Sequence, residues 1–214
     1  MPFNLPKGWV WSRLSEVAQE LSTGPFGSML HKSDYVTNGI PVVNPMNIVD
    51  GDILADDRMR ISEKTRVRLK HYTLKVGDLV IARRGNLKKC AVVKDKHAGW
   101  LCGTGSFFLR ILGIDKAFLQ LVYCSETSQR FLLRDSIGQT MDNLNQKLLF
   151  RLPLAIPSLN EQVAIVNRVV RLLAMVSDLE AQVSDRKAKS DDLMQAVLKE
   201  AFEGNSHGFQ GANG

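Results

Sequence analysis

The chain has 214 residues, of which 44% are hydrophobic and 23% charged, a composition typical of a globular protein. No apolar run approaches the roughly 18 residues of a membrane span, and the first residues lack the layout of a signal peptide, so we expect a cytoplasmic protein without membrane contact. The three cysteines form no CxxC pair, which argues against a disulfide framework or a four-cysteine zinc site.

The net charge of +6 is spread unevenly along the chain. Residues 1–157 hold 22 Lys+Arg and 14 Asp+Glu, giving +8, whereas residues 158–214 hold 6 and 8, giving −2. Residues 58–96 alone carry 13 basic side chains against three acidic ones. This concentration is typical of a surface that binds a polyanion, most often nucleic acid, although a merely soluble basic face would give the same count.

The first third of the chain reads as short strands and turns. An apolar set from Trp9 to Val17 is followed by a turn-rich loop at residues 22–28. Residues 39–43 predict a short strand, with Pro41 favouring an edge or a strand start. Ser62 has the position of an N-cap for a short helix that ends near residue 69.

The clearest strand pattern lies between residues 76 and 93. Residues 79–82 predict a buried strand, residues 83–86 a connection, and residues 90–93 the returning strand. Residues 107–112 predict a further strand, Asp115 opens a helix, and another helix surrounds Phe131. Strands interleaved with short helices, without strict βαβ repetition, predict an α+β domain with a mixed sheet over residues 1–157.

The last quarter of the chain predicts one long helix, over residues 158–204, and a disordered tail at 205–214. Ser158 and Glu161 have the spacing of a capping box. The apolar residues then recur at intervals of 4, 3, 4, 3 and 4, as in a coiled-coil seam that another helix must cover. Arg186 and Ser190 weaken the seam where they take its positions. The predicted dimer interface comprises Ile165, Val169, Leu172, Val176, Leu179, Val183, Leu193 and Val197.

Catalytic motifs are absent from the sequence. The stretch from Asn44 to Asn47 lacks the second proline and the aromatic residue of an adenine methyltransferase motif. Acidic residues such as Asp52 and Asp78 occur singly in turns, unlike the clustered carboxylates of a metal-dependent nuclease. The four histidines are scattered, and we interpret them as surface residues. We therefore expect a non-catalytic protein without a metal or cofactor.

The pattern of polar residues favours DNA binding instead. The loop between the two strands at 79–82 and 90–93 is rich in donors, and arginine can chelate guanine whereas lysine mostly meets phosphate. The alternative reading of this loop is a solvated hairpin tip. A second polar cluster, with Thr140 and Asn143, is equally compatible with a plain turn. The predicted phosphate contacts are Lys64, Arg66, Arg68, Lys88 and Lys89, and the predicted base readers are Arg83, Arg84 and Asn143. Lys32, Asn86 and Thr140 are further predicted DNA-binding residues.

Several segments, in this order, resemble the specificity subunit of Type I restriction–modification enzymes. The most specific is LPLAIPSLNEQ at residues 152–162, because it leads directly into the long helix. The other matching segments are LPKGW at 5–9, TGPFGS at 23–28, GIPVV at 39–43, GDLVI at 77–81, and GQT at 138–140. The resemblance extends over nearly the whole chain, to about residue 204.

The resemblance implies a role as well as a fold. In that family a target recognition domain reads one half of a split DNA sequence, and a conserved-region helix sets the distance to the other half. Full subunits carry two such domains and two antiparallel helices, on which methyltransferase subunits dock. This chain, with one domain and one helix, resembles a half subunit, either natural or a fragment. Such a chain is expected to form a homodimer on double-stranded DNA and to join methyltransferase and restriction subunits.

Two other classes of function stay open on the residues alone. A coiled-coil assembly protein could use the same helix while its basic domain binds a protein partner. A small nuclease would instead cleave DNA in the presence of Mg²⁺. Binding of duplex DNA that is sensitive to salt and survives random competitor would favour the DNA-recognition subunit over these two classes.

Overall fold

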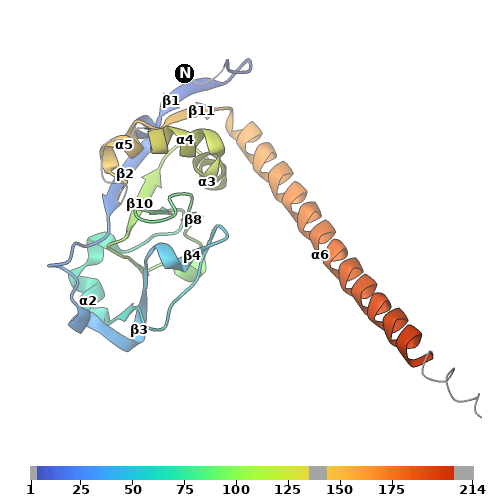
Figure 1. Cartoon of the computed structure of the whole chain (residues 1–214). Helices are drawn as coiled ribbons and strands as arrows, with labels where there is room; N and C mark the ends of the chain where they lie inside the picture. The colour runs from blue at the N-terminus through green and yellow to red at the C-terminus, as the bar shows by residue number, and fades with distance from the viewer. Residues whose placement is uncertain (1–3, 135–143, 205–214) are drawn as a thin grey trace, which may run out of the picture. The chain divides into compact units, whose positions relative to one another are not determined.

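The computed structural model describes residues 4–134 and 144–204 (Figure 1). The chain divides into two units, one ending at Val166 and the other beginning at Asn167. The elements of the first unit, up to the start of the last helix, are β1 (Val10–Arg13), α1 (Leu14–Val17), β2 (Ala18–Thr23), η1 (Lys32–Asp34), β3 (Tyr35–Val43), η2 (Pro45–Asn47), β4 (Ile48–Val49), β5 (Asp52–Ile53), β6 (Arg60–Ile61), α2 (Glu63–Arg68), η3 (Lys70–Tyr72), β7 (Leu79–Ala82), β8 (Cys90–Val92), η4 (Asp95–His97), β9 (Leu101–Cys102), β10 (Ser106–Ile111), α3 (Lys116–Cys124), α4 (Glu126–Arg134), α5 (Gln146–Phe150) and β11 (Pro153–Ile156).

The strands form small sheets with both pairing directions. The largest has the order β2-β10-β7-β8 with antiparallel neighbours. A second, of order β6-β3-β9, pairs β3 with β6 antiparallel and with β9 parallel. The predicted α+β class with mixed pairing is therefore confirmed.

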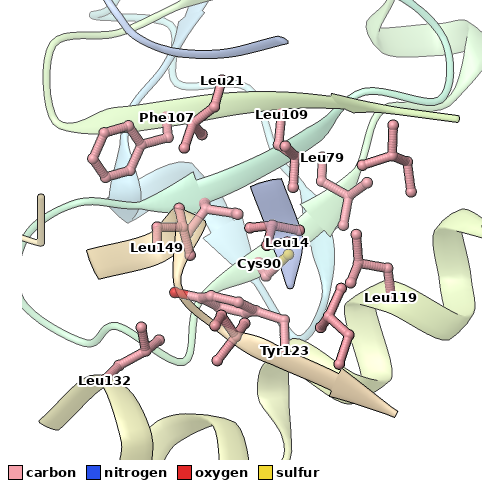
Figure 2. Packing of buried hydrophobic residues seen from close by; sticks show 14 of the residues in the cluster. Leu14, Leu21, Leu79, Cys90, Phe107, Leu109, Leu119, Tyr123, Leu132 and Leu149 are labelled. Carbon is pink, nitrogen blue, oxygen red and sulfur yellow. The ribbon is translucent and has the colours of Figure 1, made fainter. Parts of the chain in front are cut away.

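The largest sheet separates two hydrophobic clusters because strand side chains alternate between its faces. Leu79 and Ile81 of β7 belong to one cluster, together with residues of α3, α4 and α5. Figure 2 shows Leu79 and Tyr123 in this cluster. Val80 points to the other cluster, which includes Phe108 of β10. The hairpin that leaves β7 thus starts from a strand packed on both sides.

Most predicted elements of this domain are present where the sequence placed them. Ser62 caps α2 by accepting from the Thr65 N–H, and Asp115 caps α3 by accepting from the Phe118 N–H. The expectation for Pro41 was wrong, because Pro41 lies inside β3, the central strand of its sheet. Proline is tolerated there because the pairing with β9 begins only at Val42.

The two ends of the domain meet in a pairing that the sequence did not indicate. Strand β1 runs antiparallel to β11, with Trp11 opposite Ala155. The Leu14 N–H also donates to the Leu152 carbonyl at 2.9 Å. This ribbon delivers the chain to the start of the last helix, α6 (Leu159–Gly204).

The first turns of α6 belong to the domain, so the compact unit extends beyond the predicted boundary at residue 157. The predicted capping box is confirmed, because Glu161 accepts from the Ser158 N–H and its own N–H donates to Ser158 Oγ. Gln162, only 1% exposed, accepts from the Asp115 N–H at 2.8 Å and donates to the Pro157 carbonyl at 2.9 Å. Ile165 is partly buried against the same cluster as α3, and its place in the dimer interface stays a prediction.

Beyond Val166, α6 continues as one helix through the weak point of the seam (Figure 1). Side-chain pairs four residues apart support its exposed surface there: Gln182 donates to Asp178 and Lys189 pairs with Asp185, each at 2.7 Å. None of the described helices is long and apolar enough to cross a bilayer.

Candidate nucleic-acid interface

The loop that joins β7 to β8, residues 83–89, carries several cationic side chains, and we call it the basic loop. Its base is closed by the bond from the Ala82 N–H to the Lys89 carbonyl, 2.9 Å. Asn86 Oδ1 accepts from the Lys88 N–H at 3.0 Å, and Gly85 takes a positive φ of 69° that glycine adopts readily. The Leu87 carbonyl accepts from the buried Tyr123 hydroxyl at 2.7 Å, which ties the loop to α3.

Two other loops are clamped against the end of β10, beside the basic loop. The Gly24 N–H donates to the Ser106 carbonyl at 3.0 Å, and Thr104 Oγ1 donates to the Pro25 carbonyl at 2.7 Å. A Cβ on Gly24 would lie 2.0 Å from the Gly103 carbonyl oxygen, so only glycine allows this approach. The Gly24 N–H is therefore committed to a hydrogen bond within the protein.

The Asn44 segment and the Gly103-Thr104-Gly105 turn also support this region. Asn44 Oδ1 accepts from the Gly105 N–H at 3.4 Å, and a Cβ on Gly103 would lie 2.3 Å from the same oxygen. Neither segment forms a nucleotide cradle. The Asn44 side chain packs against the glycine backbone of the turn, which fixes the ends of the strands that carry the basic loop.

The basic side chains of the loop differ in how they are held. Lys88 is exposed, as are Arg84 and Asn86. Lys89 instead is half-buried and donates from Nζ to the Pro45 carbonyl at 3.0 Å, which makes it a brace between two loops. Arg83 is half-buried, and its guanidinium lies 5.7 Å from the ring centroid of Phe26 and 6.0 Å from that of Phe107.

The basic residues predicted on α2 are partly neutralised. Arg66 pairs with Glu63, and Arg68 pairs with Asp34 at 2.7 Å while also donating to the Met29 carbonyl. Lys64 and Lys32 are exposed, on α2 and η1 respectively. Exposed ion pairs are weak, so the two arginines can still exchange partners, but their net field is reduced.

Carboxylates, most of them from outside residues 58–96, balance much of the charge counted in that window. Six of its 13 basic residues form ion pairs: Arg58, Arg60, Arg66, Arg68, Lys94 and Lys96. Asp52 alone meets both Lys94 and Lys96, at 3.0 and 3.1 Å. Among the described residues, Lys88 and Arg83 of the basic loop have no acidic partner, so their positive charge is not balanced by an ion pair.

The single carboxylates act as structural groups, as predicted. Asp78 is buried and accepts from Arg110 Nε at 3.1 Å and from the Lys75 N–H at 2.9 Å. Burial raises the pKa of the Asp78 carboxyl despite these bonds, because the low-polarity surroundings disfavour its charge. No group of three or more His, Cys, Asp or Glu side chains suited to a metal ion occurs in residues 4–134 and 144–204.

His97 corrects the interpretation of the histidines as surface residues. Its side chain is 0% exposed, its Nδ1 accepts from the Lys94 N–H at 3.2 Å, and its ring meets Trp100 edge-on. Burial lowers the pKa of His97, and the nearby Lys96 charge acts in the same direction. His97 is thus a neutral packing residue at neutral pH. Thr140, Asn143 and His207 lie outside the described residues.

Helix α6 carries the predicted apolar stripe. Leu172, Val176, Leu179, Val183, Leu193 and Val197 are all exposed, and Val169 is half-buried. With about 100° between successive residues, these positions fall within one face of the helix. The face is a stripe of aliphatic side chains without a covering element in residues 167–204 themselves.

Comparison with known proteins identifies the family to which a chain with this fold belongs. The family described as Type I restriction modification DNA specificity domain matches residues 6–186. The chain belongs to this family.

Individual relatives agree with this assignment. The chain is 39% identical over 204 residues to the Type I restriction enzyme EcoDI specificity subunit of Escherichia coli, covering 94% of this chain and 43% of that protein. It is 24% identical over 201 residues to the EcoBI specificity subunit of Escherichia coli, covering 94% of this chain and 42% of that protein. The chain therefore spans less than half the length of these relatives.

Solved structures confirm the fold. The HsdS subunit from Thermoanaerobacter tengcongensis matches with a TM-score of 0.71 at 23% identity, over 93% of this chain and 50% of that one. A chain from a study of complex assembly and conformational transition of the type I R-M system also gives a TM-score of 0.71, at 24% identity over 94% of this chain and 47% of that one.

One neighbour of the basic loop was missed in the sequence. Phe26 is 52% exposed and lies over Arg83, whereas the sequence around it predicted only a turn-rich loop. An aromatic residue between two glycines in a polar loop was the available signal, since such side chains are usually buried.

Proposed function

We propose that this chain is a non-catalytic DNA-recognition subunit of a Type I restriction–modification system, acting on double-stranded DNA in the cytoplasm. The observation that carries the proposal is the basic loop, held rigidly by β7, β8 and α3 in a chain of the DNA specificity domain family. A rigid support lets donors reach a duplex with little loss of conformational entropy on binding.

The basic side chains take different roles in this proposal. Lys88 and Lys64, both exposed, meet phosphates, and Lys32 extends the same kind of contact. Lys89 is reassigned from a phosphate contact to a brace, because its ammonium group already donates to the Pro45 carbonyl. Arg83 and Arg84 are the base-side residues of the loop.

The stripe on α6 supports an isologous homodimer. A helix of 46 residues is about 70 Å long at a rise of about 1.5 Å per residue, long enough to hold two recognition domains at a fixed distance. An exposed aliphatic stripe of this length favours association, and a two-fold dimer places the same surface on both partners. Such a dimer reads an interrupted inverted repeat.

A second apolar face of α6 supports recruitment of a further subunit. Val170 and Leu173, 58% and 59% exposed, lie on a different face from the seam, because at about 100° per residue they are about 160° and 100° around the helix from Leu172. One partner helix covers only the seam, so these side chains are left for another protein. We assign this face to the methyltransferase subunit, through which the restriction subunit joins the complex.

The proposal is tested by fluorescence anisotropy with labelled duplex DNA, alone and with a methyltransferase subunit of a Type I restriction–modification system. Binding is expected to weaken steeply with salt and to survive excess random competitor once the target is present. If random competitor abolishes binding to every duplex tested, even in the presence of the methyltransferase, the result supports the alternative of a coiled-coil assembly protein. Mg²⁺-dependent cleavage by the isolated chain supports a nuclease instead.

A further inference from the structure

The side chain of Arg83 is partly shielded from water, yet it has no acidic partner among the described residues. Its side chain is half-buried, and no carboxylate in residues 4–134 or 144–204 pairs with it. Other arginines of the domain do have carboxylate partners: Arg68 pairs with Asp34, and Arg110 with both Glu20 and Asp78. A desolvated cation without a counter-charge is unfavourable for folding, and such groups concentrate at functional sites.

Aromatic rings hold the Arg83 guanidinium in place of carboxylates. The ring of Phe107, which is fully buried in the core of the domain, lies 6.0 Å away, and the half-exposed ring of Phe26 lies 5.7 Å away. A ring face attracts a guanidinium and orients its plane, but it accepts none of its five N–H donors in a strong hydrogen bond. The rings therefore restrict the side chain while leaving its donors available.

The backbone of Arg83 is fixed as well. Its N–H donates to the Gly105 carbonyl at 2.9 Å, and its carbonyl accepts from the Leu144 N–H at 2.9 Å. Arg83 thus sits at the end of β7 between two neighbouring segments, whereas Lys88 projects from the tip of the loop. A residue fixed at its backbone and its side chain suits geometric recognition, while a flexible exposed lysine suits a phosphate.

We propose that Arg83 reads a guanine in the recognised half-site and that Phe26 is its positioning residue. The inference rests on the proposed DNA recognition and deepens it by naming the base and the supporting side chain. Guanine is the base whose O6 and N7 both accept from one guanidinium fork in the major groove. Phe26 acts only through Arg83, by limiting the orientations of the guanidinium.

The test is a selection of bound sequences from a randomised duplex pool, with the full chain and five variants at one salt concentration. Arg83→Lys keeps the charge but loses the fork, so the preference for G at one position is expected to fall about ten- to a hundred-fold. Phe26→Leu keeps the apolar volume but removes the ring, so the preference at that same position is expected to fall about two- to five-fold. Phe26→Tyr restores the ring and is expected to restore the preference.

Lys88→Ala is the matched control, because it removes a cation from the same loop without touching Arg83. It is expected to weaken binding to all sequences alike and to leave the base preferences unchanged. The double variant Phe26→Leu/Arg83→Lys is expected to show the preference of Arg83→Lys alone, since Phe26 has no fork left to position.

A second measurement examines the positioning without DNA. In ¹⁵N-labelled protein the Arg83 Nε–H resonance is expected to be shifted upfield by the ring current of Phe26 in the wild type and in Phe26→Tyr, and to move back in Phe26→Leu. An unchanged resonance in Phe26→Leu overturns the positioning role.

The selection separates two failures. A wild-type chain that enriches sequences while Arg83→Lys enriches the same ones overturns the inference and leaves the proposed function standing. A wild-type chain that enriches no sequence, even with the methyltransferase, overturns both. A loss at the Arg83 position that Phe26→Tyr does not restore contradicts the role of Phe26.

Discussion

Replacement of Leu179 by alanine tests the proposed dimer in a quantitative way. Leu179 lies in the middle of the seam and is 58% exposed, so pairing can bury about that share of its side chain. Leu179→Ala removes three carbons, each worth about 0.8 kcal/mol when buried, which after scaling by that exposure amounts to about 1.4 kcal/mol per copy. The substitution occurs twice in a homodimer, for a total of about 2.8 kcal/mol, or a dissociation constant about a hundred-fold larger.

Sedimentation velocity over a concentration series measures this constant directly. The control is Val170→Ala, a residue with the same 58% exposure that lies outside the seam. The control is expected to dimerise as the wild type does, but to bind the methyltransferase more weakly. Equal losses of dimer for both variants, or a wild-type chain that stays monomeric at micromolar concentration, would refute the assignment of the seam.

Further predictions concern the basic loop and its support. Lys88→Ala is expected to reduce the slope of log K against log salt by about 0.9. Lys89→Ala is expected to leave the slope unchanged, because the wild-type ammonium group already donates to the Pro45 carbonyl. Identical slopes for Lys88→Ala and wild type would contradict the phosphate contact. Gly24→Ala places a Cβ against the Gly103 carbonyl and is expected to cost about 1–3 kcal/mol in urea unfolding; full stability would show that the loops are not clamped. Arg110→Met strands the buried Asp78 carboxylate and is expected to cost about 3–5 kcal/mol at neutral pH. Burial raises the pKa of Asp78, and loss of Arg110 raises it further. The loss of stability in Arg110→Met is therefore present in full above the pKa of Asp78 and shrinks as the pH falls through it. A loss of stability that does not depend on pH speaks against an unpaired carboxylate.

Local patterns in the sequence predicted the elements that depend on neighbouring residues. The β7–β8 hairpin, the caps at Ser62, Asp115 and Ser158, and the long helix all follow from residues within a few positions of one another. The pairing of β1 with β11 and the parallel pairing of β3 with β9 join segments that are distant in the sequence. Nothing in the local sequence of these strands indicates which strand each one pairs with.

The same limit applies to the candidate site. The sequence located the basic loop, but charge counted along residues 58–96 could not reveal that Asp34 or Asp52, from earlier turns, neutralise part of it. Nor could it separate Lys88 from Lys89, since only the folded chain brings the Pro45 carbonyl to the Lys89 ammonium group. The docking of Ile165 onto the domain was hidden for the same reason, because its spacing also suits the seam.

The arrangement of the bound sequence is the most direct measure of the central claim, that two copies of this domain read DNA at a distance set by α6. Sequences selected from a random duplex pool by the wild-type chain with its methyltransferase are expected to contain an inverted repeat. Its two halves should be separated by a spacer of constant length and arbitrary sequence. A single uninterrupted motif, or halves whose spacing varies freely, would contradict the account.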